Sequence, residues 1–348
     1  MKSSMRTPAD DGLFMPAEWE PHARCWMQWP SRAEVWREQL PQTYMAYARV
    51  ARAISEFEPV SMVCRPSDVA QAQLACGRGV EVVPFEIDDS WARDSGPTFL
   101  SDGDGHVAGI HWRFNAWGNS YSPHDNDAKV GGLILKHLGA RCYEGPMVLE
   151  GGSICVDGYG TLLTTEECLF NENRNPELTR QQIEERLALH LGVRRIIWLD
   201  QGLEDDETDG HVDMICCFAG PGRVLLHMPE DTSDLNWKRM QDNRKRLEAA
   251  KDARGNKLEI IELPQPKINR KRDDGRRLST SYVNFYIANG GIVMPSFDDP
   301  NDDVARGIIA AAFPDRKVVQ VPALDIAVGG GVIHCITQQQ PVGEITGA

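Results

Sequence analysis

The sequence predicts an α/β fold, because short β-type runs alternate with helical patterns along its 348 residues. Runs rich in β-branched residues, such as Val60–Cys64, are typical of strands. Between such runs, apolar residues recur at helical spacing, for example Ile183, Leu187 and Leu191. Since no linker interrupts this alternation, we expect one domain over residues 1–348, with residues 1–12 as a flexible N-terminus.

Strands are expected wherever a short apolar run is bounded by turn residues. In chain order these runs are Arg24–Trp29, Val60–Cys64, Val80–Phe85, Ser153–Val156, Thr161–Thr165, Arg195–Leu199, Val212–Phe218, Arg223–His227, Leu258–Leu263, Tyr282–Ala288 and Lys317–Val321. Helices fit between them. One carries the apolar stripe from Tyr47 to Phe57, a second lies between Pro176 and Gly192, and Asn301 is expected to cap a third over Asp302–Phe313.

The composition limits the partners and the compartment. With 37 basic and 51 acidic residues, the formal charge is −14, which disfavours nucleic acid as a partner and favours a small cation. Nine cysteines without regular spacing indicate a reducing compartment. The N-terminus has no apolar signal core, and no run approaches the roughly twenty apolar residues of a membrane span. We therefore expect a cytoplasmic protein that binds neither nucleic acid nor membrane.

The segment Gly329–Pro341 carries the strongest chemical signal. Its three glycines let the backbone approach a ligand closely. The β-branched pair Val332-Ile333 is expected to form a short buried strand that holds Cys335 in place. Cys335, next to a histidine, is interpreted as a positioned nucleophile. The alternative is a buried structural cysteine, which is the commoner fate of this residue type.

Three further loops carry the groups that a thiol needs in order to act on a cationic carbon. They are Asp88–Pro97, Leu149–Gly152 and Asp205–Asp213. In the third loop, His211 and Asp213 are two residues apart in a predicted strand, so both side chains are expected on one face as proton shuttle and cation anchor. Because each loop adjoins a predicted strand, we expect similar strand–helix modules to deliver these loops to a common centre.

Metal and nucleotide sites are poorly supported by the sequence. A calcium loop starting at Asp205 would require glutamate at its twelfth position, which is Cys216. There is no Cys-x-x-Cys pair, His-Glu-x-x-His helix or phosphate-binding loop, so we expect neither a metal nor a cofactor. Four other acids are interpreted as solvated loop charges: Asp88, Asp89, Asp205 and Asp206.

Two tryptophans, Trp91 and Trp117, lie in loops. An aromatic face can hold a cation or an alkyl chain, so lining a pocket and packing a loop are equally expected for both residues. Among the remaining histidines, His22 follows the motif Trp19-Glu20-Pro21, and a structural role is favoured for it.

Six ordered motifs together resemble those of the agmatine deiminases. They are Met15–His22, Trp91–Pro97, Leu149–Ser153, Thr208–Asp213, Ser281–Gly291 and Gly329–Pro341, and the similarity spans about Phe14 to Pro341. The resemblance implies a five-module pseudo-symmetric α/β propeller, the pentein fold, with the active site on its axis. It also implies a homodimer and a place in putrescine and polyamine biosynthesis.

The resemblance further implies a role for each residue of the site. Cys335 matches the nucleophile, His211 the general acid and base, and Glu150 the carboxylate that orients His211 and helps to bind the substrate. Asp94 and Asp213 match the pair that grips the guanidinium. A planar guanidinium presents forked donors, which suit carboxylates on two sides.

The implied reaction is hydrolytic deimination of agmatine to N-carbamoylputrescine and ammonia through a covalent thiouronium on Cys335. Trp91, Trp117 and Gly330 are expected to complete the substrate pocket. The loop Asn119–Asp127 departs from the aromatic, acid-rich version associated with the family.

Several alternatives stay open. They are a deiminase of peptidylarginine, free arginine or a longer guanidinoalkylamine, an amidinotransferase, and a catalytically silent binding protein. An arginine-specific site would require a cation at the far end of the substrate, for which Arg93 and Arg113 are the candidates.

Overall fold

The structure is a computed structural model that describes residues 6–272 and 275–347. Its strands are β1 (His22–Gln28), β2 (Val60–Cys64), β3 (Val80–Pro84), β4 (Thr98–Ser101), β5 (His106–Arg113), β6 (Cys142–Val148), β7 (Cys155–Val156), β8 (Thr161–Thr165), β9 (Arg195–Leu199), β10 (Cys216–Gly220), β11 (Arg223–Met228), β12 (Glu259–Pro264), β13 (Tyr286–Ala288), β14 (Gly291–Ser296), β15 (Lys317–Pro322), β16 (Thr337–Pro341) and β17 (Glu344–Ile345).

The helices fall into long and short groups. The longer ones are α2 (Leu40–Ser55), α3 (Val69–Cys76), α6 (Asp127–Leu138), α8 (Arg180–Leu191), α9 (Leu235–Ala249) and α10 (Asp302–Ala312). The short ones are η1 (Ala9–Asp11), α1 (Ala33–Trp36), η2 (Arg37–Gln39), η3 (Pro66–Asp68), α4 (Ala92–Ser95), α5 (Ala116–Asn119), η4 (Gly151–Ser153), α7 (Glu166–Leu169), η5 (Val212–Met214), α11 (Leu324–Ala327) and η6 (His334–Ile336).

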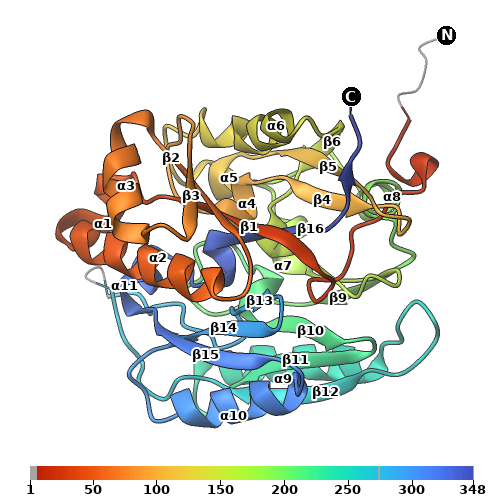
Figure 1. The fold of residues 1–348 in the computed structure, drawn as a ribbon. Coiled ribbons are helices and arrows are strands. Elements are labelled where there is room, and N and C mark those ends of the chain that lie inside the picture. The colour runs from red at the N-terminus through yellow and green to blue at the C-terminus, as the bar shows by residue number, and fades with distance from the viewer. Residues whose placement is uncertain (1–5, 273–274, 348) are drawn as a thin grey trace.

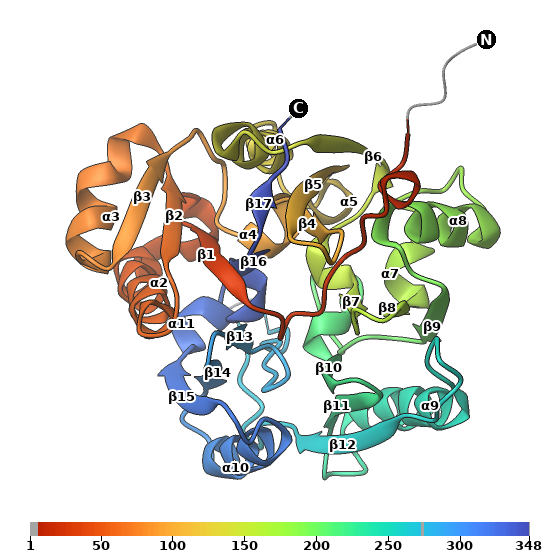
Figure 2. The same cartoon turned by 45° about the vertical axis from the view of Figure 1, so that its right-hand side comes forward.

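One strand pattern recurs in five small sheets. Two strands pair antiparallel, a helix follows, and a third strand pairs parallel with the second. In one sheet, for example, β7 and β8 are antiparallel, and β9, reached through α8, is parallel to β8. The five sheets with their helices form a ring (Figures 1 and 2), with β1–β3, β4–β6, β7–β9, β10–β12 and β13–β15 following one another around it in Figure 2. The predicted α/β class and five-module propeller are confirmed.

The ring is closed by the far end of the chain. Strand β16 pairs antiparallel with β1 and so supplies the first strand of the first module, while β2 and β3 follow in parallel. Strand β17 adds to the edge of the second module by pairing with β5. The middle strands, such as β2 and β8, are buried along their whole length, as expected of parallel strands covered on both faces.

Several predicted elements are confirmed. The bounds of β2, β8 and β9 are the predicted ones, and six other predicted strands differ by one or two residues at an end. The run Tyr282–Ala288 becomes a strand only from Tyr286, and β4, β5, β6, β14, β16 and β17 were not predicted. The helix predicted over Asp302–Phe313 ends one residue earlier, at Ala312. Asn301 occupies its N-cap position, but its side chain donates to the Gln265 carbonyl at 2.8 Å instead of capping the helix.

Two predicted strands near the ring centre are wrong, and for the same reason. The run Val212–Phe218 begins with the 3-10 turn η5, and β10 starts only at Cys216. The pair Val332-Ile333 lies in a turn before η6, and the strand is β16, which follows Cys335. These apolar residues are buried in turns at the centre of the ring, and a short apolar run does not distinguish a buried turn from a buried strand.

The N-terminal segment and the helix lengths complete the fold. Of residues 1–12, which were expected to be flexible, residues 1–5 lie outside the described residues, and η1 lies within the segment. Asp11 accepts a hydrogen bond from the Tyr143 hydroxyl at 2.7 Å. Within residues 6–272 and 275–347, no helix combines the length and the apolar composition that crossing a membrane requires.

Candidate active site

Each module contributes a polar side chain from the turn just before its first strand. Asp94 lies in α4, ahead of β4, and Glu150 directly precedes η4 and β7. Asp213 lies in η5 ahead of β10, Asn284 precedes β13, and Cys335 lies in η6 ahead of β16. The turns touch one another, since α4 contacts both η4 and η6, and η4 contacts η5. The modular repeat therefore gathers five chain segments at one point, as the sequence predicted for four of them.

The thiol of Cys335 is held among polar groups. Its side chain is buried, with the residue only 4% exposed. The thiol donates to Asp213 Oδ2 at 3.6 Å, and Asn284 Nδ2 donates to the sulfur at 3.2 Å. Asn284 Oδ1 also accepts from the backbone N–H groups of His334 and Cys335, at 2.9 and 3.4 Å. Asn284 thus fixes both the backbone turn and the sulfur of Cys335.

Asn284 was not among the residues predicted to form the site. It carries no titratable group, and its partners lie 50 and 51 residues away in the chain. Its motif, Ser281–Gly291, did contribute to the family resemblance. The signal that would have found it is positional, because it stands before the first strand of its module, as Asp94, Glu150, Asp213 and Cys335 do.

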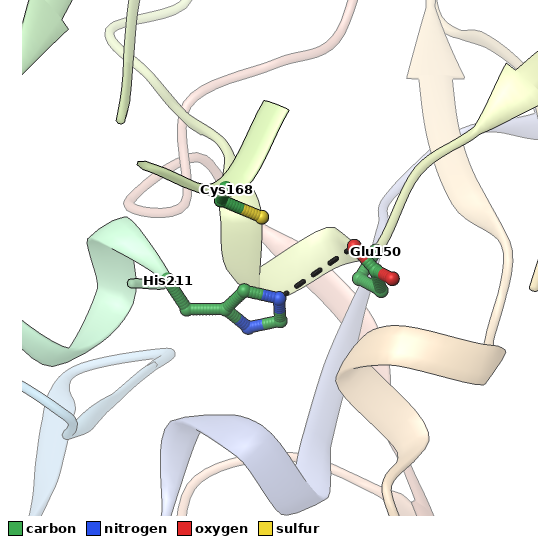
Figure 3. Close-up of side chains that lie close together, drawn as sticks. All are labelled: Glu150, Cys168 and His211. Carbon is green, nitrogen blue, oxygen red and sulfur yellow. Dashed lines mark ion pairs between the residues drawn. The ribbon is translucent and has the colours of Figure 1, made fainter. Parts of the chain in front are cut away.

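His211 lies between two carboxylates. Its Nδ1 is 3.8 Å from Asp94 Oδ1, and its Nε2 is 3.7 Å from Glu150 Oε2 (Figure 3). Both ring nitrogens are buried and lack a hydrogen-bond partner among the described residues. Burial opposes a charge on the ring, but Asp94, with Cys168 and Glu150, raises the pKa of His211 well above its usual value. The histidine is therefore a charged group that is close to carboxylates and still available to a ligand.

Glu150 is anchored from behind. Arg174 Nε donates to Glu150 Oε1 at 2.8 Å, and both side chains are fully buried. Burial raises the pKa of Glu150, but the Arg174 charge and His211 outweigh it and lower the pKa below the usual value. Glu150 is consequently ionised at neutral pH.

Three side chains near Glu150 could in principle bind a metal ion. The side chains of Glu150, Cys168 and His211 lie close together (Figure 3), and their ligand atoms are within 4.8 Å of one another. Glutamate, cysteine and histidine are all ligands that zinc accepts. However, the Arg174 guanidinium already occupies one oxygen of Glu150, and its fixed positive charge repels a second cation at this distance. The three residues therefore fit a metal poorly.

Gly152 shows how closely the groups of the site converge. A Cβ atom at this position would lie 2.6 Å from His211 Nδ1 and 2.9 Å from both Asp94 Oδ1 and Asp213 Oδ2. The backbone N–H of Gly152 donates to Asp94 Oδ1 at 2.9 Å. Only a residue without a side chain fits here, which explains the second glycine of the predicted Leu149–Gly152 loop.

A small pocket leads to Cys335. Its walls include five residues predicted for the site, namely Trp91, Asp94, Trp117, Gly330 and Cys335. Five further wall residues were not predicted individually: Tyr121, Glu207, Thr208, Gly329 and Gly331. Trp117 Nε1 donates to Asp94 Oδ2 at 2.9 Å. His211, Glu150 and Asp213 are not among these walls, and Asp213 lines a second, separate pocket with Glu18 and His334.

The charges at the centre disfavour a free thiolate. Burial, Asp213 and Asp94 together raise the pKa of Cys335 well above its usual value. Burial also raises the pKa of Asp94, in spite of His211, and the neighbouring carboxylates Asp213 and Glu150 add to the increase. A bound cation between Asp94 and Asp213 would relieve both effects.

His334 was not predicted to take part in the site. Its Nδ1 is 2.8 Å from Asp213 Oδ2, and its Nε2 is 2.9 Å from Glu18 Oε1. Arg93 Nη1 in turn donates to Glu18 at 3.3 Å. His334 was visible in the sequence as the neighbour of Cys335, but its partners come from distant parts of the chain.

The acids interpreted as solvated charges behave differently from one another. Asp88 and Asp89 are buried, so that interpretation is wrong for both. Asp88 accepts from the backbone N–H and the side-chain Nδ2 of Asn126, and Asp89 pairs with Arg32 at 3.2 Å. Burial and Asp127 raise the pKa of Asp89 to about 7.

The other two acids, Asp205 and Asp206, bind the loop around them. Asp205 is exposed, as expected, and accepts from the Arg277 N–H. Asp206 accepts from the Thr208 hydroxyl and the Gly210 N–H, at 2.8 and 3.2 Å, and so shapes the loop that leads to His211.

The structure also shows where His22 and the two candidate arginines, Arg93 and Arg113, lie. His22 is buried against Glu58, at 3.2 Å, and Tyr286, which agrees with the structural role favoured for it. Neither Arg93 nor Arg113 lines the pocket beside Cys335. Arg93 faces Glu18, and Arg113 is exposed and donates to the Pro146 carbonyl.

A ring of five ββαβ modules, with a buried thiol, a histidine and three carboxylates meeting at its centre, defines a pentein-fold protein with a cysteine–histidine site. The particular branch follows from comparison with known families. The chain belongs to the family of Porphyromonas-type peptidyl-arginine deiminases, whose model matches residues 14–341.

Individual relatives agree with this assignment. The chain is 47% identical over 363 residues to the agmatine deiminase of Pseudomonas aeruginosa strain LESB58, covering 98% of this chain and 99% of the relative. It is 46% identical over 364 residues to that of Ectopseudomonas mendocina, with the same coverage. The solved agmatine deiminase of Enterococcus faecalis has a TM-score of 0.95 at 36% identity and covers 97% of this chain and 98% of its own. The resemblance drawn from the six motifs is confirmed.

Proposed function

We propose that the protein hydrolyses agmatine to N-carbamoylputrescine and ammonia. The observation that carries the proposal is the convergence of the Cys335 thiol, His211 and the carboxylates of Asp94 and Asp213 around Gly152 and Gly331. The relatives named as agmatine deiminases, at 46–47% identity over nearly the whole chain, support the same activity.

Asp94 and Asp213 bind the guanidinium in this proposal. Both carboxylates lie close to Gly152, and Asp213 Oδ1 is buried without a partner among the described residues. An arginine-like group with forked donors satisfies oxygens on two sides at once. The positive charge of the substrate also offsets the carboxylates that hold the Cys335 pKa high, so the substrate itself promotes formation of the thiolate.

In the first half of the reaction, the bound cation lets the Cys335 thiol lose its proton to solvent, and the resulting thiolate attacks the guanidinium carbon and forms a C–S bond. The resulting tetrahedral adduct is held by Asp94 and Asp213. His211, charged before the reaction because of its raised pKa, donates a proton to a departing nitrogen. The C–N bond breaks, ammonia leaves, and an S-alkylthiouronium remains on Cys335.

In the second half, water attacks the thiouronium carbon. His211, now neutral, accepts the proton from that water, and Glu150 holds the charge that returns to the ring. The C–S bond breaks and the sulfur leaves as a thiolate, which takes up the remaining proton of the carbonyl oxygen as the neutral ureido product is released. One water molecule is consumed and one ammonia molecule is formed per turnover.

The pocket walls support a small guanidino substrate. Trp91, Trp117 and Tyr121 line the pocket, and aromatic faces suit a short alkyl chain and a cation. Glu207 provides a carboxylate at the pocket wall, where its Oε2 accepts from the Tyr121 hydroxyl at 2.9 Å. Arg272 Nη1 donates to Glu207 Oε1, while Arg272 Nε and Nη2 are buried without a partner among the described residues, and Nη2 approaches Gly330. Arginine, whose carboxylate such a cation would suit, is therefore the competing substrate to compare with agmatine.

A substrate panel tests the proposal. Agmatine, arginine, a peptidylarginine and longer guanidinoalkylamines are supplied separately, and both ammonia and the ureido product are measured. We expect release of ammonia from agmatine well above that from the other compounds. Transfer of the amidino group to an added amine without ammonia would establish an amidinotransferase instead.

The covalent step has its own test. Cys335→Ser should abolish turnover without changing the fold, because a hydroxyl is a far weaker nucleophile toward a resonance-stabilised carbon. In the unmodified protein, mass spectrometry after an acid quench should find the thiouronium on the peptide that contains Cys335. An adduct on another cysteine, such as Cys168, would refute the assignment.

Assembly and location remain predictions from the family resemblance. We propose a homodimer and a cytoplasmic location. Light scattering of the purified protein measures its mass in solution, and a monomer would refute the homodimer.

A further inference from the structure

The imidazole of His334 lies at the centre of the ring but has no role in the reaction proposed above. The ring lies between two carboxylates, with Nδ1 2.8 Å from Asp213 Oδ2 and Nε2 2.9 and 3.0 Å from the two oxygens of Glu18. His334 is buried, as are Glu18 and Asp213. An ionised carboxylate only accepts hydrogen bonds, so both ring nitrogens must donate, and the ring is the imidazolium.

The charges around the ring balance. Glu18 and Asp213 carry two negative charges, and His334 and Arg93 carry two positive charges. Burial raises the pKa of Glu18, but His334 and Arg93 lower it to about 2. Burial and Arg93 oppose the charge on His334, while Glu18 and Asp213 raise its pKa above the usual value. A buried group of this kind is stable only while all members are present.

The hydrogen bond from His334 holds one of the two carboxylate oxygens of Asp213 and leaves the other unpaired. Its Oδ2 accepts from both His334 and the Cys335 thiol, at 2.8 and 3.6 Å, whereas its Oδ1 is buried without a partner among residues 6–272 and 275–347. The carboxylate therefore cannot turn without losing a charge-assisted hydrogen bond. Its unpaired oxygen is kept for a ligand.

We propose that His334 is a positioning residue that holds the Asp213 carboxylate in the orientation in which it binds the substrate guanidinium, with Glu18 as the anchor of His334. The inference rests on the proposed function, because it assigns the guanidinium to Asp213. His334 and Cys335 are consecutive residues, so the turn η6 places one side chain on the reacting side of Asp213 and the other behind it. Glu18 connects this turn to the chain segment that leads into β1.

Two substitutions separate the two contacts of the ring. The amide of asparagine reaches the position of Nδ1, so His334→Asn retains a donor for Asp213. The amide of glutamine reaches the position of Nε2, so His334→Gln retains a donor for Glu18 and loses the one for Asp213. A purely structural role predicts similar losses for both variants, whereas the proposal predicts that they differ.

The experiment measures agmatine affinity by calorimetry in a Cys335→Ser background. For His334→Gln we expect the Kd to rise roughly 10- to 100-fold, the range for losing a hydrogen bond to a charged group. For His334→Asn the increase should stay below about tenfold, because the Asp213 contact survives. Equal effects of the two substitutions, or normal binding by His334→Gln, would overturn the inference.

His227 provides the matched control. It is equally buried, and its Nδ1 and Nε2 face the neutral partners Ser281 and Gln265 at 3.0 and 3.1 Å. His227→Asn and His227→Gln should lower the melting temperature without changing the agmatine Kd. If they weaken binding as much as the His334 variants, the effect is general to the core, and the inference is wrong.

A further variant keeps the inference testable if His334→Gln does not fold. Glu18→Gln leaves both contacts of Asp213 in place but removes the charge that anchors His334, so the Kd should rise by roughly 3- to 10-fold. Unchanged binding would contradict the anchoring role. If the Cys335→Ser parent itself fails to bind agmatine, the proposed function falls as well, whereas normal parent binding with unaffected variants rejects the role of His334 alone.

Discussion

Trp117 and Asp94 are joined by a hydrogen bond in which the indole Nε1 donates to Asp94 Oδ2 at 2.9 Å. The other carboxylate oxygen, Oδ1, accepts from the Gly152 N–H. Asp94 is thereby oriented from two sides, and Trp117 both lines the pocket and fixes a charged group in it. From the sequence, only an aromatic contact was predicted for Trp117, and not this hydrogen bond.

Trp117→Phe tests this relationship. The ring stays and the donor is lost, so we expect KM for agmatine to rise about tenfold, as for one hydrogen bond to a charged group, with little change in the melting temperature. Trp112→Phe is the control, because Trp112 Nε1 donates to Thr98, a residue outside the pocket, at 3.0 Å. An unchanged KM in Trp117→Phe would show that Gly152 alone suffices to orient Asp94.

Gly152→Ala should remove activity by filling the centre of the site. The new methyl group would lie within 3 Å of polar atoms of His211, Asp94 and Asp213, so at least one of them must move. We expect agmatine binding to be lost in calorimetry. Gly307→Ala, in α10, is the control, since nothing lies within 4 Å of its Cβ, and it should stabilise the protein by up to about 1 kcal/mol. Normal turnover by Gly152→Ala would contradict the proposed convergence.

Alkylation by iodoacetamide reports the pKa of Cys335. Burial raises this pKa most, and Asp213 and Asp94 raise it further, so replacing Asp213 with asparagine should lower the pKa and increase the thiolate fraction at pH 8. Each unit by which the pKa falls gives about tenfold more thiolate, and lower nucleophilicity removes about threefold, so alkylation should accelerate about threefold per unit. The exposed Cys142, followed in the same digest, is the internal reference. Slower alkylation of Cys335 in Asp213→Asn would reverse the assigned sign.

The carboxylates and the histidine should differ in what they contribute. In a Cys335→Ser background, Asp94→Asn should weaken agmatine binding by several kcal/mol, because it removes a charged partner of the cation. His211→Ala should still bind agmatine, yet with Cys335 intact its turnover should fall by roughly a hundred- to ten-thousand-fold, as for other acid–base groups. If His211→Ala loses binding as severely as Asp94→Asn, the two roles have been assigned wrongly.

The sequence was informative where chemistry is local. Cys335, His211, Asp94, Asp213 and Glu150 stand in short motifs of reactive residues, and the structure brings all five together at the centre of the ring. The contacts that support them are not local, and this is why they were missed. His334 meets Glu18 across 316 positions of the chain.

The same limit applies to the strands. Strand β8, found at its predicted bounds, is an uninterrupted run of leucine and β-branched residues. Strand β5 was missed because Gly109 interrupts its pattern, and glycine weakens a strand signal. The structure shows why glycine stands there, since a Cβ would lie 2.4 Å from Leu135 in α6. Glycine is required at position 109 because helix α6 packs closely on the sheet, and this packing is visible only in the folded structure.

The pairing of β16 with β1 affects the order in which the protein folds. Residues 337–341 meet residues 22–28, so this contact cannot form while the intervening chain is still being synthesised. Contacts between such distant segments are made late and slowly. The turn that carries Cys335 lies directly before β16, and its sulfur meets Asp213 and Asn284 only when that contact exists. We therefore expect the site around Cys335 to be completed only when β16 docks on β1.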